Sequence, residues 1–311
     1  MHVPANIFIL LLGIFLLYIG ANYLVRGSAN LGRLLGIRPI IIGLTVVAFG
    51  TSMPEFMVSM FGVLAGAPDI SVGNIIGSNI ANIGLILGTA GLIAPITLKY
   101  HNIREQLIIL FLGSLLFTLL AYNGISRLEG LFFILIIVGY VVYLTKSSRD
   151  AEAVKELPEK DNSIPRNILF SLGGILALVF ASRGIIESAT NIAEHFGISQ
   201  TVIGMTVVAL GTSLPELAAS IMAQIKNESD ISIGNIIGSN LFNMFFVGGG
   251  TAAIGGLPVD VSIYGFEVPF MLVFTMLLFP VIFARKGIHR GHAGIFLALY
   301  LSFIAISYLW R

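Results

Sequence analysis

Long stretches without a single charged side chain run through most of this chain. Of its 311 residues, 17 are basic and 16 acidic, which is 11%, whereas a soluble globular protein carries about 25%. Such stretches suit membrane-spanning helices, which need about 20 apolar residues, and they lack the alternating ten-residue pattern of an outer-membrane barrel. The chain is therefore predicted to be an all-α integral membrane protein in a lipid bilayer. Long charge-free stretches include residues 5–25, 39–54, 70–98, 106–126, 130–145, 167–182, 231–259, 268–284 and 291–310.

The pattern predicts ten transmembrane helices, and the basic residues predict their orientation. With the N-terminus outside, fourteen of the 17 basic residues fall on one face, two (Arg127 and Arg311) on the other, and Arg183 lies within a span. Because positive residues collect in the cytoplasm, both termini are predicted to be extracellular and the polar loop 147–164 to be a cytoplasmic linker between halves 1–146 and 165–311. The predicted spans are 5–25, 39–66, 70–93, 103–122, 129–146, 165–190, 199–225, 230–255, 264–284 and 291–310.

An internal repeat connects the two halves. Residues 43–82 align without a gap with residues 204–243, at an offset of 161, and 22 of the 40 positions are identical. Five spans, an odd number, separate the two copies, so the second copy enters the membrane from the opposite side. The chain is thus predicted to contain two inverted five-helix repeats, the arrangement in which secondary transporters build a midplane site that opens alternately to each side.

Two glutamates, Glu55 and Glu216, occupy the same place in the two copies, about halfway along the second and seventh predicted spans. An ionised carboxylate at mid-bilayer costs roughly 2.5 to 3.5 kcal/mol on insertion scales, so it is tolerated mainly for function. A buried ion pair is the structural alternative, but no basic residue lies at comparable depth in either copy. The two glutamates are predicted to form a cation site.

Each glutamate directly follows a proline in the sequence Gly-Thr-Ser-Met/Leu-Pro-Glu. Pro54 and Pro215 cannot donate to the carbonyl groups of Gly50 and Gly211, and their rings clash with the preceding turn. A helix break is therefore predicted at each proline. Freed carbonyls and nearby hydroxyls would point at the same place as the carboxylates, which is tolerable only around a cavity or an ion site. These hydroxyls belong to Thr51, Ser52, Thr212 and Ser213.

A second motif, Gly-Asn-Ile-Ile-Gly-Ser-Asn-x-x-Asn, covers residues 73–82 and again 234–243. Its two glycines have the small-xxx-small spacing that lets helix backbones approach closely. For Asn74 and Asn235 two roles stay open, as ligands or as partners for the backbone of the broken helix. The serine and the last asparagine lie four residues apart on one helical face and can aim oxygens at one point. They are Ser78 and Asn82 in one copy, and Ser239 and Asn243 in the other.

The candidate ligands are all oxygen atoms, which favour hard cations such as Ca²⁺ and Na⁺ over zinc or copper. A net charge of +1 offers no basic surface to a nucleic acid, and the lack of cysteine excludes disulfides and thiolate chemistry. No nucleophile, base and orienting group can be assembled around the two glutamates, so neither an enzyme nor a cofactor is predicted. Two adjacent carboxylates in a low dielectric need a proton or a cation, which predicts that ions cross by exchange.

The paired Gly-Thr-Ser-x-Pro-Glu and Gly-Asn-x-Ile-Gly-Ser-Asn motifs resemble the α-repeats of the cation/calcium antiporter superfamily, specifically the prokaryotic sodium/calcium exchangers. The resemblance covers the whole chain in length, number of spans and position of the loop. It implies a ten-helix fold in which broken second, third, seventh and eighth helices hold Na⁺ and Ca²⁺. It also implies that long, tilted first and sixth helices slide to give alternating access.

The resemblance further implies a set of ligands at the matching positions. Glu55 and Glu216 would bind Ca²⁺, together with the carbonyl groups of Thr51 and Thr212. In several relatives an aspartate stands at the position of Asn243, and in potassium-dependent members an acidic residue there is associated with K⁺. Asparagine in both copies disfavours K⁺ dependence and, because proton-coupled members have a different acidic pattern, favours Na⁺. Sodium would add Ala48, Ala209, Ser52, Ser213, Ser78, Ser239, Asn82 and Asn243.

The leading hypothesis for the function is a sodium-driven calcium antiporter that works by alternating access in the plasma membrane, with Na⁺ and Ca²⁺ as the transported ions. A proton-coupled exchanger of calcium or another divalent cation is the first alternative. A passive cation channel, which would carry ions without dependence on an ion at the far side, is the second.

Overall fold

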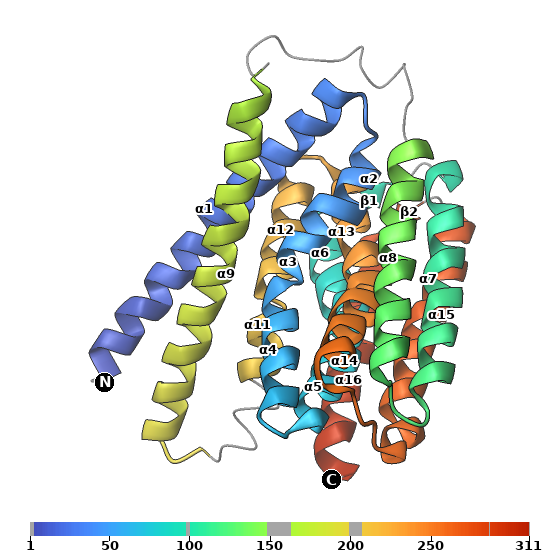
Figure 1. The fold of residues 1–311 in the computed structure, drawn as a ribbon. Helices are drawn as coiled ribbons and strands as arrows, with labels where there is room; N and C mark the ends of the chain where they lie inside the picture. The colour runs from blue at the N-terminus through green and yellow to red at the C-terminus, as the bar shows by residue number, and fades with distance from the viewer. Residues whose placement is uncertain (1–2, 98–99, 148–162, 199–206, 286, 311) are drawn as a thin grey trace.

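The computed structural model describes residues 3–97, 100–147, 163–198, 207–285 and 287–310, and almost all of them are helical (Figure 1). Two short strands, β1 (Ile96–Thr97) and β2 (Gly287–Ile288), pair antiparallel. The α-helices are α1 (Val3–Leu35), α2 (Pro39–Ile42), α3 (Ala48–Thr51), α4 (Met53–Leu64), α5 (Pro68–Ala81), α6 (Leu87–Ile93), α7 (Tyr100–Ala121), α8 (Arg127–Ser147), α9 (Ile164–His195), α11 (Ala209–Thr212), α12 (Leu214–Ile225), α13 (Ser229–Phe242), α14 (Gly249–Gly255), α15 (Glu267–Arg285) and α16 (Arg290–Trp310). The π-helical segments are η1 (Gly43–Val47), η2 (Asn82–Ile86) and η5 (Asn243–Gly248), and η6 (Val261–Gly265) is a 3₁₀ helix.

The prediction of a helical membrane protein is confirmed. Among the described residues, 7 helices are long and apolar enough to cross a membrane, and up to 8 if a bent pair is counted as one span. That pair joins Pro39–Thr51 to Met53–Leu64 at an angle of 42°. Two shorter apolar helices, Leu214–Ile225 and Glu267–Ile282, complete the set. The predicted seventh span, 199–225, begins in residues that lie outside the described part of the chain.

Helices α1 and α9 are longer than predicted. The charge pattern predicts spans 5–25 and 165–190, but α1 has 33 residues and α9 has 32. Helix α1 continues through Arg26 and Arg33, so its first charged residue marks the end of the apolar stretch and not the end of the helix. A helix of this length is about 50 Å long, more than the roughly 30 Å hydrocarbon core, and it crosses the molecule obliquely in Figure 1.

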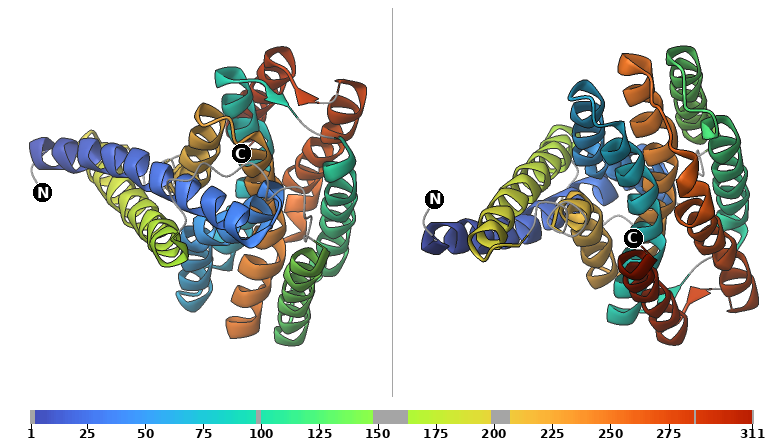
Figure 2. Two further views of the ribbon diagram at one scale, coloured as in Figure 1. Left: turned by 90° about the horizontal axis from the view of Figure 1, so that it is seen from above. Right: turned by 90° about the horizontal axis from the view of Figure 1, so that it is seen from below.

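These two long helices pack against each other at one side of the molecule and also contact the block formed by the other helices (Figure 2). Their backbones are in direct contact, because a Cβ atom added to Gly27 would lie 2.7 Å from the carbonyl oxygen of Asn167 and 2.8 Å from the amide nitrogen of Ser171. The hydroxyls of Ser28 and Ser171 are 3.2 Å apart. Small residues thus allow α1 and α9 to pack as a closely fitted pair.

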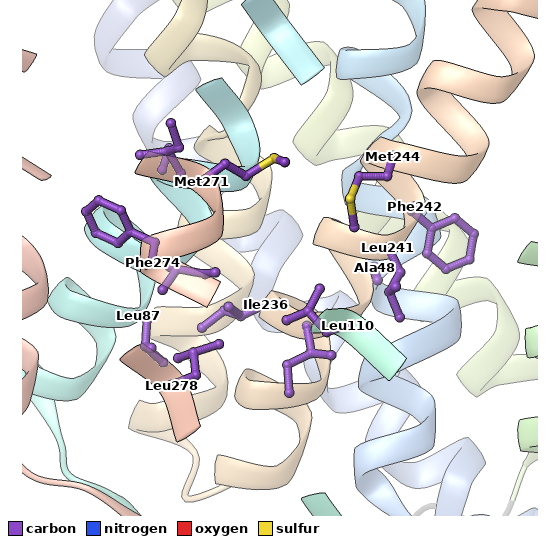
Figure 3. Close-up of a cluster of buried hydrophobic side chains, with 14 of the residues drawn as sticks. Ala48, Leu87, Leu110, Ile236, Leu241, Phe242, Met244, Met271, Phe274 and Leu278 are labelled. Atoms are coloured by element: carbon purple, nitrogen blue, oxygen red, sulfur yellow. The ribbon is translucent and has the colours of Figure 1, made fainter. Parts of the chain in front are cut away.

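The helices that carry the second motif lie at the centre. In the most apolar window of Ser229–Gly255, 94% of the residues are buried, and in that of Pro68–Ile93, 78%, compared with 22% for α1. Figure 3 shows Ile236 and Leu241 of α13 in a cluster with Leu110 of α7 and Leu278 of α15. A helix that is buried on all sides needs apolar residues all round, so the polar residues of these two helices require partners inside the protein.

The glycines of the second motif allow the close helix packing that their spacing predicts. A Cβ atom on Gly238 would lie 2.7 Å from the carbonyl oxygen of Leu44, and one on Gly234 would collide with the carbonyl of Ile40. In this copy, α13 therefore packs directly against α2 and η1. The corresponding contact of the other copy would involve residues 201–205, which lie outside the described residues.

The two copies of the repeat fold into the same order of elements at the same offset of 161. Helices α3, α4 and α5 correspond residue for residue to α11, α12 and α13. The π segments η2 and η5 begin at the equivalent residues Asn82 and Asn243. Two copies that share 22 of 40 residues therefore fold into the same order of helices, and a π segment follows each copy.

The contact between α1 and α9 yields a stability prediction. Gly27→Ala forces a methyl group against the backbone of α9 and is expected to destabilise the protein by about 1–3 kcal/mol, as overpacking does. Gly173→Ala is the matched control. Gly173 lies on the exposed side of α9, where an added Cβ atom would have no contact within 4 Å with another described residue. This variant should be neutral or stabilise by about 0.5–1 kcal/mol through helix propensity. Thermal unfolding in detergent compares the two variants; equal melting temperatures would contradict the packing described.

Candidate ion-binding site

The predicted helix breaks are present at both prolines. Helix α3 ends at Thr51, Ser52 leaves the helical conformation with φ −80° and ψ 5°, and α4 begins at Met53 with Pro54 in its first turn. In the second copy, Ser213 has φ −85° and ψ 5° between α11 and α12. A proline is tolerated in the first turn because its missing N–H would have no helical partner there. Each glutamate therefore lies in the first turn of the helix that follows the break.

The two carboxylates are buried and reach across to the opposite copy. Glu55 is 0% exposed and Glu216 is 1% exposed. Ser52 donates its hydroxyl to Oε1 of Glu216 at 3.1 Å, and Ser213 donates its hydroxyl to Oε1 of Glu55, also at 3.1 Å. Because each serine lies three residues before the glutamate of its own copy, these crossed bonds bring both glutamates into one small volume.

Part of each carboxylate has no protein partner. Within the described residues, the Oε2 atoms of Glu55 and Glu216 are buried without a hydrogen bond, and neither glutamate forms an ion pair with a basic side chain. A buried carboxylate that lacks a basic partner is costly, so an ion or a proton has to balance its charge. The orphaned oxygens fit a bound cation.

Hydroxyl groups from both copies surround the carboxylates. Thr51 and Thr212 are 0% exposed, and Ser78 and Ser239 are at most 3% exposed. The hydroxyls of Ser213 and Ser78 are 3.4 Å apart, and those of Thr51 and Ser239 are 3.5 Å apart. The structure thus brings together the predicted hydroxyl residues of the two motifs.

The two predicted alanines can offer an ion only their backbone carbonyl groups. The surroundings of Ala48 are described in full, and those of Ala209 only in part. The carbonyl oxygen of Ala48 accepts the amide of Ser52 at 3.0 Å and lies 3.3 Å from the hydroxyl oxygen of Thr51. Ala209 begins α11 at the equivalent position. One carbonyl that the prolines are predicted to free has a partner: that of Gly211 accepts the hydroxyl of Ser182 of α9 at 2.6 Å. Only part of the freed backbone is therefore open to an ion.

Asn82 and Asn243 lie at the start of the π segments η2 and η5. Asn82 donates to the side-chain oxygen of Asn240 at 3.2 Å, while its own Oδ1 has no partner. Both amide atoms of Asn243 are buried without a partner among the described residues. The resemblance implies broken third and eighth helices, but these helices continue through a π segment, which widens one turn and often marks a functional site.

The role left open for Asn74 and Asn235 is resolved by their hydrogen bonds. Asn74 donates to the backbone carbonyl of Glu55 at 3.0 Å, and Asn235 donates to that of Glu216 at 3.3 Å. Both asparagines therefore satisfy the backbone next to the break. Asn240 is not among the predicted site residues, although its motif is identical in both copies, because a single sequence does not tell which face of a buried helix contacts the other copy.

A helical membrane protein with two buried carboxylates surrounded by hydroxyl groups has the architecture of a cation transporter. The chain belongs to the sodium/calcium exchanger family, whose model, described as "Sodium/calcium exchanger protein", matches residues 5–146 and 166–309. It is therefore a multi-pass membrane protein of a cation/calcium antiporter family, and its homologues are transporters and not enzymes.

Individual relatives match over nearly the whole chain. "Inner membrane protein YrbG" of Escherichia coli is 36% identical, with 91% of this chain and 90% of that protein covered. "Sodium/calcium exchanger MaX1" of Methanosarcina acetivorans is 29% identical, with 98% and 99% covered. A solved structure of the sodium-calcium exchanger NCX_Mj has a TM-score of 0.86 and 30% identity, with 97% and 98% covered.

Proposed function

We propose that this chain is a sodium-driven calcium antiporter that exchanges Na⁺ for Ca²⁺ across the plasma membrane. The observation that carries the proposal is the pair of buried carboxylates, one from each copy of the repeat, that share crossed serine hydrogen bonds and have no basic partner among the described residues. One Ca²⁺ or two Na⁺ would balance a charge near −2, whereas the bare pair would be held in a low dielectric at high cost. This favours exchange over passive flow.

The ligand set that we propose consists of oxygens only. Glu55 and Glu216 bind Ca²⁺ together with the carbonyls of Thr51 and Thr212, because Ca²⁺ takes 6–8 oxygen ligands from carboxylates and carbonyls. Na⁺ adds groups that lie around the carboxylates, and the unpartnered Oδ1 atoms of Asn82 and Asn243 support their inclusion. The Na⁺ set comprises Ala48, Ala209, Ser52, Ser213, Ser78, Ser239, Asn82 and Asn243.

The architecture that we propose is ten transmembrane helices in two inverted repeats. The long helices, the bent pair and the two shorter apolar helices add up to ten when each is one span. Reciprocal contacts support a two-fold relation: Ser52 contacts Glu216 as Ser213 contacts Glu55, the pattern of an isologous interface. An odd number of spans between the copies puts that axis in the membrane plane.

The orientation follows from the basic residues. We propose extracellular N- and C-termini, halves 1–146 and 165–311, and a cytoplasmic linker 147–164, of which residues 148–162 lie outside the described part of the chain. The excess of basic residues on one face supports this assignment.

Sodium is proposed as the counter-ion because the polar residues at the π segments are amides. Asn82 and Asn243 are 1% and 0% exposed and carry no titratable proton. A proton-coupled carrier would gain most from acidic groups at these positions. Proton coupling remains the alternative outcome of the test that follows.

The function is tested by flux into proteoliposomes that contain the purified chain. An outward Na⁺ gradient should drive Ca²⁺ uptake, and a pH gradient of the same size should have no effect. The assay is repeated under imposed membrane potentials to measure the charge carried per cycle. Uptake that follows the pH gradient and ignores Na⁺ would select proton coupling, and uptake without any ion at the far side would select a channel.

Neutralising either glutamate should abolish the exchange. Glu55→Gln and Glu216→Gln keep the size of the side chain but remove half of the charge that holds Ca²⁺, so Na⁺-driven uptake is expected to fall to the level of protein-free vesicles. Glu187→Gln is the matched control, because Glu187 lies exposed on α9 in an ion pair with Arg183. Retained exchange in both site variants, with normal folding by size-exclusion chromatography, would remove the site assignment.

Adding a third carboxylate should change the ion dependence. Asn243→Asp places an acid where both amide atoms are unpartnered. The new carboxylate can take up a proton that competes with cations, so exchange is expected to become inhibited by acid over a pH range in which the unaltered chain responds less. Asn191→Asp, on α9 outside the site, serves as the control. A pH profile and ion selectivity identical to those of the unaltered chain would mean that Asn243 does not contact the ions.

A further inference from the structure

The bonds of Asn74 reach both copies of the repeat. Its amide nitrogen donates to the carbonyl oxygen of Glu55 at 3.0 Å and to the hydroxyl of Ser59 at 2.9 Å, both on α4. Its amide oxygen accepts the hydroxyl of Thr212 at 3.3 Å, on α11 of the other copy. Because the nitrogen faces two acceptors, the oxygen has to face the other copy.

Asn235 repeats this arrangement in the opposite direction. Its nitrogen donates to the carbonyl oxygen of Glu216 at 3.3 Å and to the hydroxyl of Ser220 at 2.9 Å, both on α12. Its oxygen accepts the hydroxyl of Thr51 at 3.2 Å, on α3. The two asparagines therefore form a reciprocal pair of bridges between the halves of the molecule.

These bridges differ from the asparagines that we propose as Na⁺ ligands. Both hydrogens and the oxygen of the Asn74 and Asn235 amides are used inside the protein, whereas Asn82 and Asn243 keep amide atoms without a partner in the described part of the chain. An amide whose hydrogen bonds are all made within the protein holds its neighbours in place. An amide without such partners can bind a ligand. The two kinds of asparagine in one motif thus have different tasks.

We propose that Asn74 and Asn235 are positioning residues that couple the two half-sites to each other. Each holds the carboxylate helix of its own copy at the break and, through a threonine hydroxyl, the last turn before the break in the other copy. Ca²⁺ needs oxygens from both copies at once. Each asparagine bridge therefore sets the distance between the glutamate of its own copy and the threonine of the other copy. This inference rests on the proposed function, because it assigns a task within the proposed ion site.

The crossed partners allow a double-mutant test with a built-in control. Thr212→Val removes the hydroxyl that Asn74 binds and keeps the shape and the backbone carbonyl, and Thr51→Val does the same for Asn235. Each is combined with Asn74→Ala and, separately, with Asn235→Ala. The readout is the apparent Ca²⁺ affinity, taken both from Na⁺-driven uptake and from the Ca²⁺-dependent rise in melting temperature in detergent.

The bridge predicts a specific pattern of coupling. Thr212→Val should weaken the apparent Ca²⁺ affinity about fivefold in the unaltered chain, as the loss of one buried hydrogen bond does, and about twofold or less in the Asn74→Ala background. Thr51→Val should keep its full effect in that background. The pattern should reverse with Asn235→Ala, and Thr212→Ser, which restores the hydroxyl, should recover most of the loss.

The outcomes separate the bridge from the proposed function. If both threonine variants have the same effect in both asparagine backgrounds, the asparagines have only a general structural role and the inference is overturned. If Ca²⁺ stabilises the chain but a Na⁺ gradient drives no uptake, the sodium-coupled function fails and the melting data still decide the bridge. If Ca²⁺ does not stabilise the unaltered chain, there is no Ca²⁺ site for the asparagines to position, and the inference fails as well.

Discussion

Two like charges buried at the same place are the constraint on which the rest of this structure depends. Glu55 and Glu216 are removed from solvent, and neither forms an ion pair within the described residues. Their burial is costly unless donors and a counter-ion surround them. Hydroxyls and amides from four helices supply some of the hydrogen bonds that the site needs. The carboxylate oxygens that have no partner among the described residues are left for a counter-ion.

The internal repeat provides the geometry of the site. Each copy supplies one carboxylate and one serine, and the serine is used by the other copy, so neither half completes its own half-site. The same exchange recurs with the asparagine and threonine pairs. Each kind of bond therefore occurs twice, once in each direction, as at the interface of an isologous dimer.

The sequence predicts the features that a local signal carries. Proline beside a deep glutamate predicts both the break and the acid, and the glycine spacing predicts the close approach of α13 to η1. The end of α1 is missed because Arg26 ends the apolar run without ending the helix, and α9 continues from the predicted end at residue 190 to His195. The π segments leave no residue signature, and the bonds of Asn74 and Asn240 depend on which helices pack together, which only the tertiary structure determines.

The two copies carry equivalent residues at the candidate site, but the surroundings of these residues differ. Ser182 of α9 binds the carbonyl of Gly211, whereas Ala21, the equivalent residue of α1, has no hydroxyl to offer Gly50. Arg33 of α1 pairs with Glu228 in the loop before α13, and Ala67 stands at the position equivalent to Glu228. The long helices therefore contact the two copies of the repeat unequally: α9 binds the backbone just before the break at Ser213, and α1 holds the start of α13 through an ion pair.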